Sequence, residues 1–246
     1  MLSLIKIELN KVSKSKLFFA WLSTILIILG ITGIIIMGLG TDNKLGEFVG
    51  QSSNNFRIAD QWGNWAIATS LFSSLFTKAA FLIFESYLLS RIIIDEFKQR
   101  TIFQLFSYPI PKIKLLWGKI ISVILIAYIA QFSAYLVIQL LIKLVAILTE
   151  SNYIPVANQL INLAGITFGT VLIGLLPFVL GMIKHSTAIT MLTGLGLAAL
   201  LSNASPGSLS NNIADTLFFL IFASFISLMI TSFSISSISR QDISIK

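Results

Sequence analysis

The sequence contains no cysteine, a single histidine and few charged residues. Without cysteine, the chain can form neither a disulfide nor a thiolate metal site, and it has no cysteine nucleophile. One histidine excludes a histidine-rich metal centre. Only 11% of the 246 residues are charged, whereas a soluble domain carries about 25%. These shortages argue against a metalloprotein and against a soluble globular domain.

A phosphate-binding loop is also missing. Gly118 and Lys119 are followed by Ile120, and no glycine precedes them at the spacing that the G-x-x-x-x-G-K-[ST] loop requires. The many hydroxyl residues are not accompanied by a convincing base and orienting acid. We therefore expect a chain that is not an enzyme by itself and that holds no cofactor or metal of its own.

Apolar residues, by contrast, are abundant. They make up 56% of the chain, and the mean hydropathy is +0.91. A helix that crosses a bilayer needs about 20 predominantly apolar residues. The sequence therefore predicts an all-α integral membrane protein, formed as a single transmembrane domain over residues 1–246. Its six predicted transmembrane helices are residues 17–39, 67–94, 120–142, 160–183, 188–201 and 217–238.

The first 16 residues have a different pattern. Leu2, Ile5, Leu9 and Val12 recur at helical spacing, and lysines occupy much of the remaining surface. This pattern predicts an amphipathic helix that lies at the membrane interface and contacts lipid headgroups. The apolar run after it is too long for the core of a cleaved signal peptide, so we expect the first span to be retained.

The basic residues predict the orientation. With six spans, only Lys44, Arg57 and Lys143 fall in the loops on one side of the membrane. The loops and chain ends on the opposite side contain thirteen basic residues: Lys6, Lys11, Lys14, Lys16, Arg91, Lys98, Arg100, Lys112, Lys114, Lys119, Lys184, Arg240 and Lys246. Because positive loops remain in the cytoplasm, both termini are predicted to be cytoplasmic. The net charge of +7 therefore indicates membrane topology, and we expect no nucleic-acid partner.

Residues 95–119 form the longest polar interruption of the chain. Within them, Thr101 and Gln104 form a capping box that opens a helix. Pro109 and Pro111 cannot continue that helix, so it must be short. The segment is predicted to be cytoplasmic, with three apolar residues on its short helix: Ile102, Leu105 and Phe106.

The residues of this segment resemble the signature of ABC type-2 exporter permeases. In that family an acidic residue, a Gly-Thr pair, two apolar residues, a proline and a lysine come after the second span. Arg100 departs from the pattern, because the family usually has glycine before the threonine. The matching residues are Glu96, Thr101, Leu105, Phe106, Pro109 and Lys119.

The resemblance implies that residues 101–107 are a coupling helix that docks on a separate ABC ATPase, which binds ATP and Mg²⁺. Glu96, Thr101 and Pro109 would belong to this contact, and residues 1–16 would be a connecting helix. The apolar residues of the short helix would anchor the contact, with Lys98 and Arg100 at its rim. The alternative is that the short helix only lies on the membrane.

The family also implies a second permease chain, identical or not, in a bacterial plasma membrane. Length and small outer loops resemble permeases that remove bacitracin, lantibiotics or phenol-soluble modulins, which implies hydrophobic or amphipathic peptide cargo and peptide resistance. Two alternatives are another cargo (lipid, drug or ion) and a membrane immunity or scaffold protein that transports nothing. Gly165 and Gly169 are interpreted as a close helix contact.

Two ionisable residues lie within the second predicted span. Lys78 and Glu85 are seven residues apart and therefore share a helix face. Such groups at membrane depth usually face a bundle interior or a wet cavity. They are predicted to line the pathway or the contact between two permease chains, together with Phe72, Phe76 and Phe84. The alternative is that each charged head reaches its nearest interface.

Overall fold

The computed structural model describes residues 14–39, 63–99, 111–148, 160–184, 186–204 and 213–240. All regular structure within these ranges is helical, which confirms the predicted fold class for this part of the chain. The elements are α2 (Lys14–Leu39), α4 (Gly63–Leu89), the π-helix η1 (Ser90–Ile94), α5 (Asp95–Lys98), α7 (Lys112–Leu148), α8 (Leu160–Ile173), α9 (Leu176–Lys184), α10 (Thr187–Ala204) and α11 (Ile213–Arg240).

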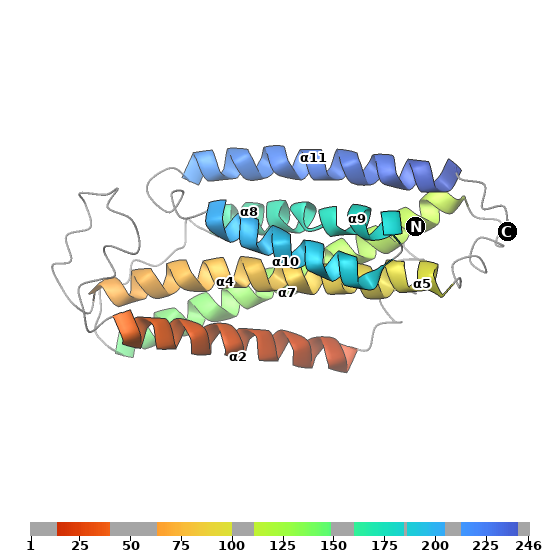
Figure 1. Cartoon of the computed structure of the whole chain (residues 1–246). Coiled ribbons are helices and arrows are strands. Elements are labelled where there is room, and N and C mark those ends of the chain that lie inside the picture. The colour runs from red at the N-terminus through yellow and green to blue at the C-terminus, as the bar shows by residue number, and fades with distance from the viewer. Residues whose placement is uncertain are drawn as a thin grey trace.

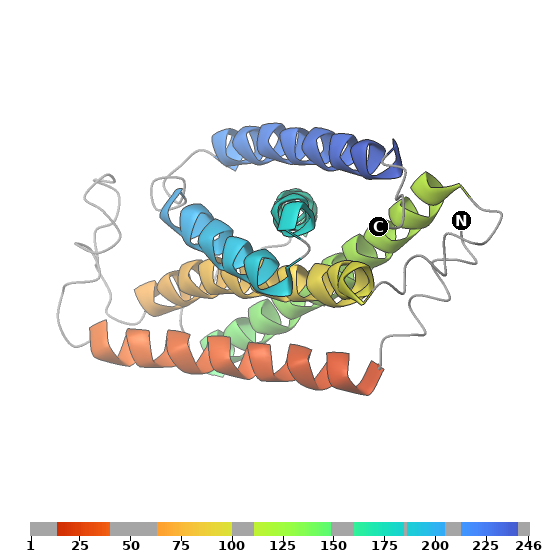
Figure 2. The ribbon, with the colours of Figure 1, turned by 45° about the vertical axis from the view of Figure 1, so that its right-hand side comes forward.

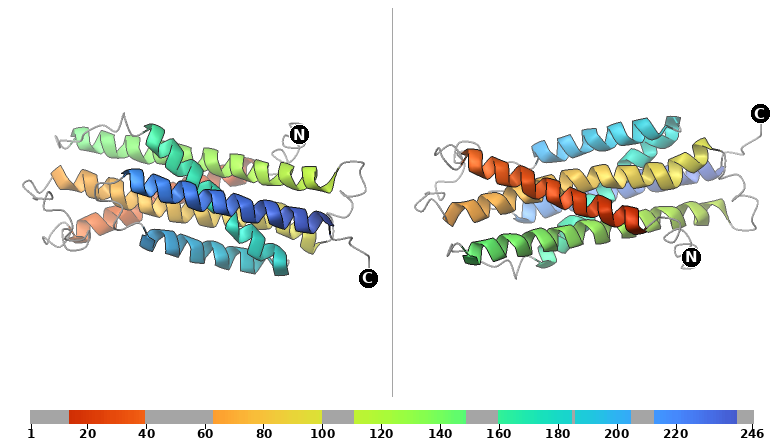
Figure 3. Two further views of the ribbon diagram at one scale, coloured as in Figure 1. Left: turned by 90° about the horizontal axis from the view of Figure 1, so that it is seen from above. Right: turned by 90° about the horizontal axis from the view of Figure 1, so that it is seen from below.

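Most of the helices run lengthwise along the bundle (Figure 1), and the α8–α9 pair crosses them obliquely (Figure 3). When the molecule is turned, the teal α8–α9 pair is seen nearly end-on in the middle, with α11 on one side (Figure 2). The helices α11 and α2 lie on opposite faces of the bundle (Figure 3). The helix α4 packs on α10, α7 and α2, whereas α11 packs mainly on α8. The bundle therefore has α4 and α8–α9 inside and α2 and α11 outside.

Four stretches are long and apolar enough to cross a membrane: Leu17–Ile34, Lys112–Val145, Leu163–Lys184 and Leu220–Ser237. A shorter apolar helix covers Thr187–Leu201. Apolar residues are spread around these helices rather than confined to one stripe, as is typical of helices surrounded by lipid and protein. The described residues thus agree with a multi-pass membrane protein, and the count of six spans remains a prediction.

Two of the differences from the predicted spans have a clear cause in proline. The helix α7 begins at Lys112, eight residues before the predicted third span, because Pro111 is well suited to the helix start, where its missing N–H is not needed. The predicted fourth span is interrupted between α8 and α9. Pro177 has no N–H for the carbonyl of Ile173, and the Leu175 N–H donates to the Leu172 carbonyl at 3.4 Å.

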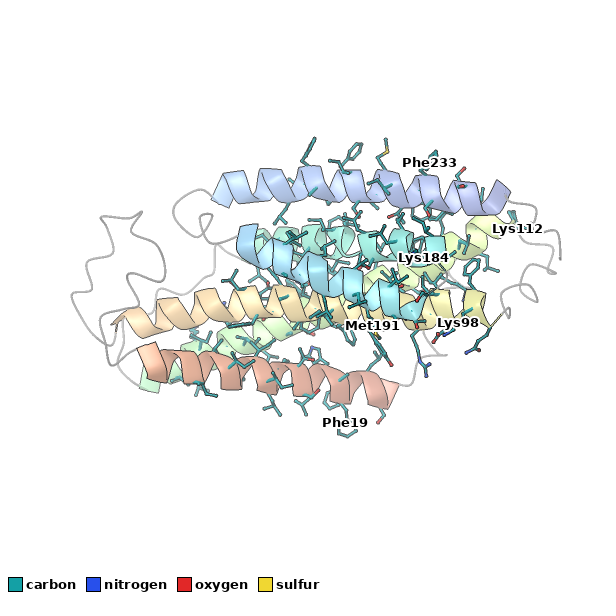
Figure 4. The ribbon with its side chains drawn as sticks, viewed as in Figure 1. Phe19, Lys98, Lys112, Lys184, Met191 and Phe233 are labelled. Carbon is teal, nitrogen blue, oxygen red and sulfur yellow. The ribbon has the colours of Figure 1, made fainter. Side chains whose placement is uncertain are left out.

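Two apolar clusters hold the helices together. One joins α4, η1, α5, α7, α8, α9 and α11, and the other joins α2, α4 and α7. The outer faces are apolar as well. Phe19 of α2 and Phe233 of α11 point away from the bundle on opposite sides (Figure 4), with 65% and 78% of their surface exposed. These faces suit contact with lipid chains or with another membrane helix.

Candidate functional site

The predicted coupling contact is described in part. Glu96 lies in α5, at the end of a continuous helical run over residues 63–98. The start of α7 then receives the chain at Lys112. Residues 1–13 of the predicted connecting helix lie outside the described ranges. The same holds for the remaining predicted residues of the coupling contact, which are Thr101, Ile102, Leu105, Phe106 and Pro109.

Glu96 forms a buried ion pair with Lys119 of α7. The distance between Lys119 Nζ and Glu96 Oε2 is 2.9 Å, and the two side chains are 1% and 14% exposed. Ile93, Ile120 and Leu116 are each fully buried in the surrounding apolar cluster. Removing either charge would leave the other in this largely apolar environment without its ion-pair partner, which is costly.

The π-helix η1 precedes this ion pair directly. A π-helical turn contains an extra residue, which rotates the residues after it by about 100° relative to an α-helix. The same turn carries Arg91, whose Nη1 lies 3.2 Å from Asp95 Oδ2. This second pair is solvent-facing, since Arg91 is 69% exposed. Consecutive carboxylates of α5 therefore bind in different directions, Asp95 along its own helix and Glu96 across to α7.

Glu85 is buried near the C-terminal end of α4, four residues before its last residue, at 1% exposure. Its carboxyl group lies against Gly174, at the interruption between α8 and α9, where a Cβ atom would come within 2.6 Å of Glu85 Cδ. Among the described residues, Glu85 Oε1 has no hydrogen-bond partner. Lys78 is half-buried on the same helix, about 10.5 Å away along the axis. The shared face is present, and a role in the pathway or in a permease contact stays a prediction.

The predicted pathway phenylalanines pack between helices. Phe84 contacts both apolar clusters, and its ring lies 5.9 Å from that of Phe81 in an edge-to-face arrangement. Phe76 packs against the cluster shared by α2, α4 and α7. The side chain of Phe72 is outside the described part of the structure. Within one chain these rings therefore contribute to helix packing, and their place along a pathway remains a prediction.

Hydrogen bonds between helices surround the central α8–α9 pair. Gln131 Nε2 of α7 donates to Thr170 Oγ1 of α8 at 3.0 Å, and Ser227 Oγ of α11 donates to the Leu172 carbonyl at 2.6 Å. In membranes such bonds contribute about 0.6 kcal/mol each on average. The Leu172 carbonyl belongs to the last turn before the interruption, so Ser227 supports the backbone where the helix is broken.

Small residues allow close helix contacts. Gly194 of α10 lies directly against Ser86 of α4. Gly169 of α8 lies against Leu220 of α11, where an added Cβ would meet the leucine Cβ at 3.4 Å. Gly165, in contrast, is exposed on α8. The close contact expected for the Gly165/Gly169 pair is therefore seen for Gly169.

Sequence reasoning missed the burial of Lys119 and the contact of Gly194. The charge count treats Lys119 as a loop residue, whereas it is a buried residue one to two turns into α7. A signal was available, because Leu115, Leu116 and Ile120 share its surroundings at helical spacing. A lysine among such neighbours needs a partner of opposite charge. Glycine contacts leave no comparable trace in a single sequence.

Comparison with known proteins decides the family. Residues 4–201 match the family model of the ABC-2 family transporter protein, which covers most of the chain. The chain belongs to the ABC-2 transporter family. The uncharacterized protein YcbO of Bacillus subtilis (strain 168) is 27% identical to this permease over 251 residues, which include 98% of this chain and 100% of the relative. No solved structure matches the permease.

Family membership explains the absence of a phosphate-binding loop. An ABC-2 permease is the transmembrane subunit of a transporter, and an ABC ATPase subunit is its partner. This permease is accordingly a multi-pass membrane protein that works with an ATPase. The relative from Bacillus subtilis is itself uncharacterized, so the cargo is a matter of proposal.

Proposed function

We propose that this ABC-2 permease, with a second permease chain and an ABC ATPase, exports hydrophobic or amphipathic peptides from a bacterial cell. The observation that carries the coupling part is the structure of one end of the bundle. There the chain passes from α5 to α7 through residues 99–111. One ion pair, between Glu96 of α5 and Lys119 of α7, joins the two helices directly. A permease that receives work from another subunit needs a rigid contact of this kind.

The same end of the bundle carries the positive charge. Lys98, Lys112 and Lys184 lie together at this end (Figure 4). By the positive-inside rule this end faces the cytoplasm, where the ATPase resides. Residues 101–107 would then dock on the ATPase through apolar side chains. This arrangement supports the predicted coupling helix and the predicted cytoplasmic termini.

The cargo proposal rests on the apolar surfaces of the bundle. Outward-facing Phe222, Phe225 and Phe233 lie along α11 and are each at least 60% exposed. Aromatic side chains give a large contact area with the apolar face of an amphipathic helix. Few charged groups interrupt these surfaces, so a hydrophobic or amphipathic peptide suits them better than a small polar solute. Lys78, which is half-buried on α4, would offer a polar contact within the membrane.

The test uses the permease co-expressed with a candidate ABC ATPase from the same organism. The complex is purified, placed in vesicles, and its ATP hydrolysis is measured with an amphipathic helical peptide, with a lipid analogue and with no addition. We expect the peptide to raise hydrolysis and to accumulate in inside-out vesicles. Stimulation by the lipid analogue alone would refute the peptide cargo, and a permease that binds no ATPase would refute the transporter.

A matched pair of variants tests the coupling helix. Leu105→Asp with Phe106→Asp places two charges on the predicted apolar face and should abolish co-purification of the ATPase. Gln104→Glu with Ser107→Asp adds the same charge elsewhere on the short helix and should leave the complex intact, because Glu can replace Gln in the capping box. Loss of the complex in both variants, or in neither, would contradict the predicted contact.

A further inference from the structure

Lys119 is one of the largest fully buried side chains in the described part of the chain, and its relative exposure is 1%. A buried lysine is costly unless it is paired, and here its ammonium group meets Glu96 at 2.9 Å. The neighbouring pair of Arg91 and Asp95 lies within one helix and faces outward. Only the Glu96–Lys119 contact, of these two ion pairs, joins separate helices.

The position of this ion pair along the chain is specific. Glu96 lies in the short helix that ends at Lys98, and Lys119 lies two turns after the start of α7 at Lys112. The pair therefore joins the two helices close to the positions where residues 99–111 leave α5 and enter α7. The rotation introduced by η1 directs Glu96 toward α7.

An ion pair is not the most stabilising choice for such a site. Buried ion pairs are often no more stable than apolar side chains of the same volume, because both charges lose their hydration. The ion pair adds one preferred geometry to the apolar contacts that Leu116 makes in the same cluster. A contact of this type fixes the relative position of α5 and α7.

We propose that Glu96 and Lys119 are positioning residues for energy coupling. Their ion pair braces both ends of residues 99–111, so that movement of this segment displaces α5 and α7 together. The inference rests on the proposed coupling role of residues 101–107. Without the ion pair, α5 and α7 would respond separately to the ATPase, and ATP hydrolysis would no longer be linked to transport.

The first test measures geometry and needs no partner. Because the chain has no cysteine, spin labels can be attached at Lys98→Cys and Lys114→Cys, two exposed sites on either side of the segment. We expect one narrow distance distribution in the parent chain and a broad one when Glu96→Gln and Lys119→Met are combined. An unchanged distribution in this neutral variant would overturn the brace.

The second test measures coupling in the complex with the ATPase that co-purifies with the parent chain. The neutral variant should retain the ATPase but lose permease-dependent stimulation of hydrolysis by roughly tenfold. The reversed pair, Glu96→Lys with Lys119→Glu, should recover most of it and also serves if the neutral variant does not accumulate. Arg91→Gln, which removes the exposed pair, should leave stimulation unchanged.

The outcomes separate the two proposals. Full stimulation in the neutral variant, or no recovery in the reversed pair, overturns the brace while the transporter assignment stands. A parent chain that never stimulates an ATPase refutes the proposed function and the coupling role with it. A merely structural ion pair would lower the thermal midpoint of the neutral variant without changing the ratio of transport to hydrolysis.

Discussion

Replacing Gly194 by alanine should separate α10 from α4. The added Cβ would stand 2.5 Å from Ser86 Cβ, whereas carbon atoms in contact lie about 3.5–4.0 Å apart. Ser86 Cβ is tied to the α4 backbone, so a rotamer change cannot relieve the clash. The helices must part by about 1–1.5 Å, and overpacking of this size costs about 1–3 kcal/mol.

Gly196→Ala is the matched control on the same helix. No atom lies within 4 Å of its added Cβ, so this variant gains only the helix propensity of alanine over glycine, about 1 kcal/mol. Gly194→Ala has the same gain, and the difference between the two variants is therefore the steric cost. For a chain of this length the apparent midpoint should differ by about 2–12 °C.

The assay is thermal unfolding of the detergent-purified permease at one fixed heating rate, because unfolding of such proteins is often irreversible. Ser86→Gly removes both the Cβ and the hydroxyl, and it should restore the Gly194→Ala variant to near the midpoint of Ser86→Gly alone. Equal midpoints for Gly194→Ala and Gly196→Ala, or failure of this rescue, would refute the close contact of α4 and α10.

Two further predictions use the same measurement. Gly174→Ala should lower the free energy of unfolding by about 1–3 kcal/mol, because its Cβ displaces the buried carboxyl group of Glu85. Adding Glu85→Ala to this variant should recover most of the lost stability. Adding Glu85→Gln should not, because glutamine has the same size as glutamate. Trp21→Phe removes the 3.0 Å bond from Nε1 to the Ala130 carbonyl and should lower stability by about 0.6 kcal/mol, with about 1.7 as the upper end. A midpoint of Trp21→Phe equal to that of the parent would show that this bond is absent.

The helices were the predictable part of the fold. Long apolar runs have few other solutions in a membrane, because every backbone polar group must be bonded within its own helix. This constraint explains why four predicted spans have counterparts long and apolar enough to cross. The interruption after α8 was harder to predict, since Pro177 is compatible with a kink as well as with a break.

The candidate site was predictable only where spacing alone decides it. Lys78 and Glu85 share a face because seven residues make two helical turns. The neighbours of Glu85 could not be predicted from spacing, since Gly174 contacts Glu85 only because α8 and α9 pack on α4. The Glu96–Lys119 pair likewise depends on how η1 and α7 are oriented, and a charge count assigns both residues to solvent.

Close packing around η1 extends the consequences of the ion pair to the centre of the bundle. Ile94, two residues before Glu96, places its Cδ1 2.8 Å from where a Cβ at Gly181 of α9 would stand. The hydroxyl of Thr190 in α10 fills the other side of the same glycine. Packed interiors have little free volume, so η1, which continues directly into α5, cannot be displaced without moving α9 and α10. A force received at residues 99–111 would therefore reach the interrupted helix beside Glu85 through contacts that are already closed.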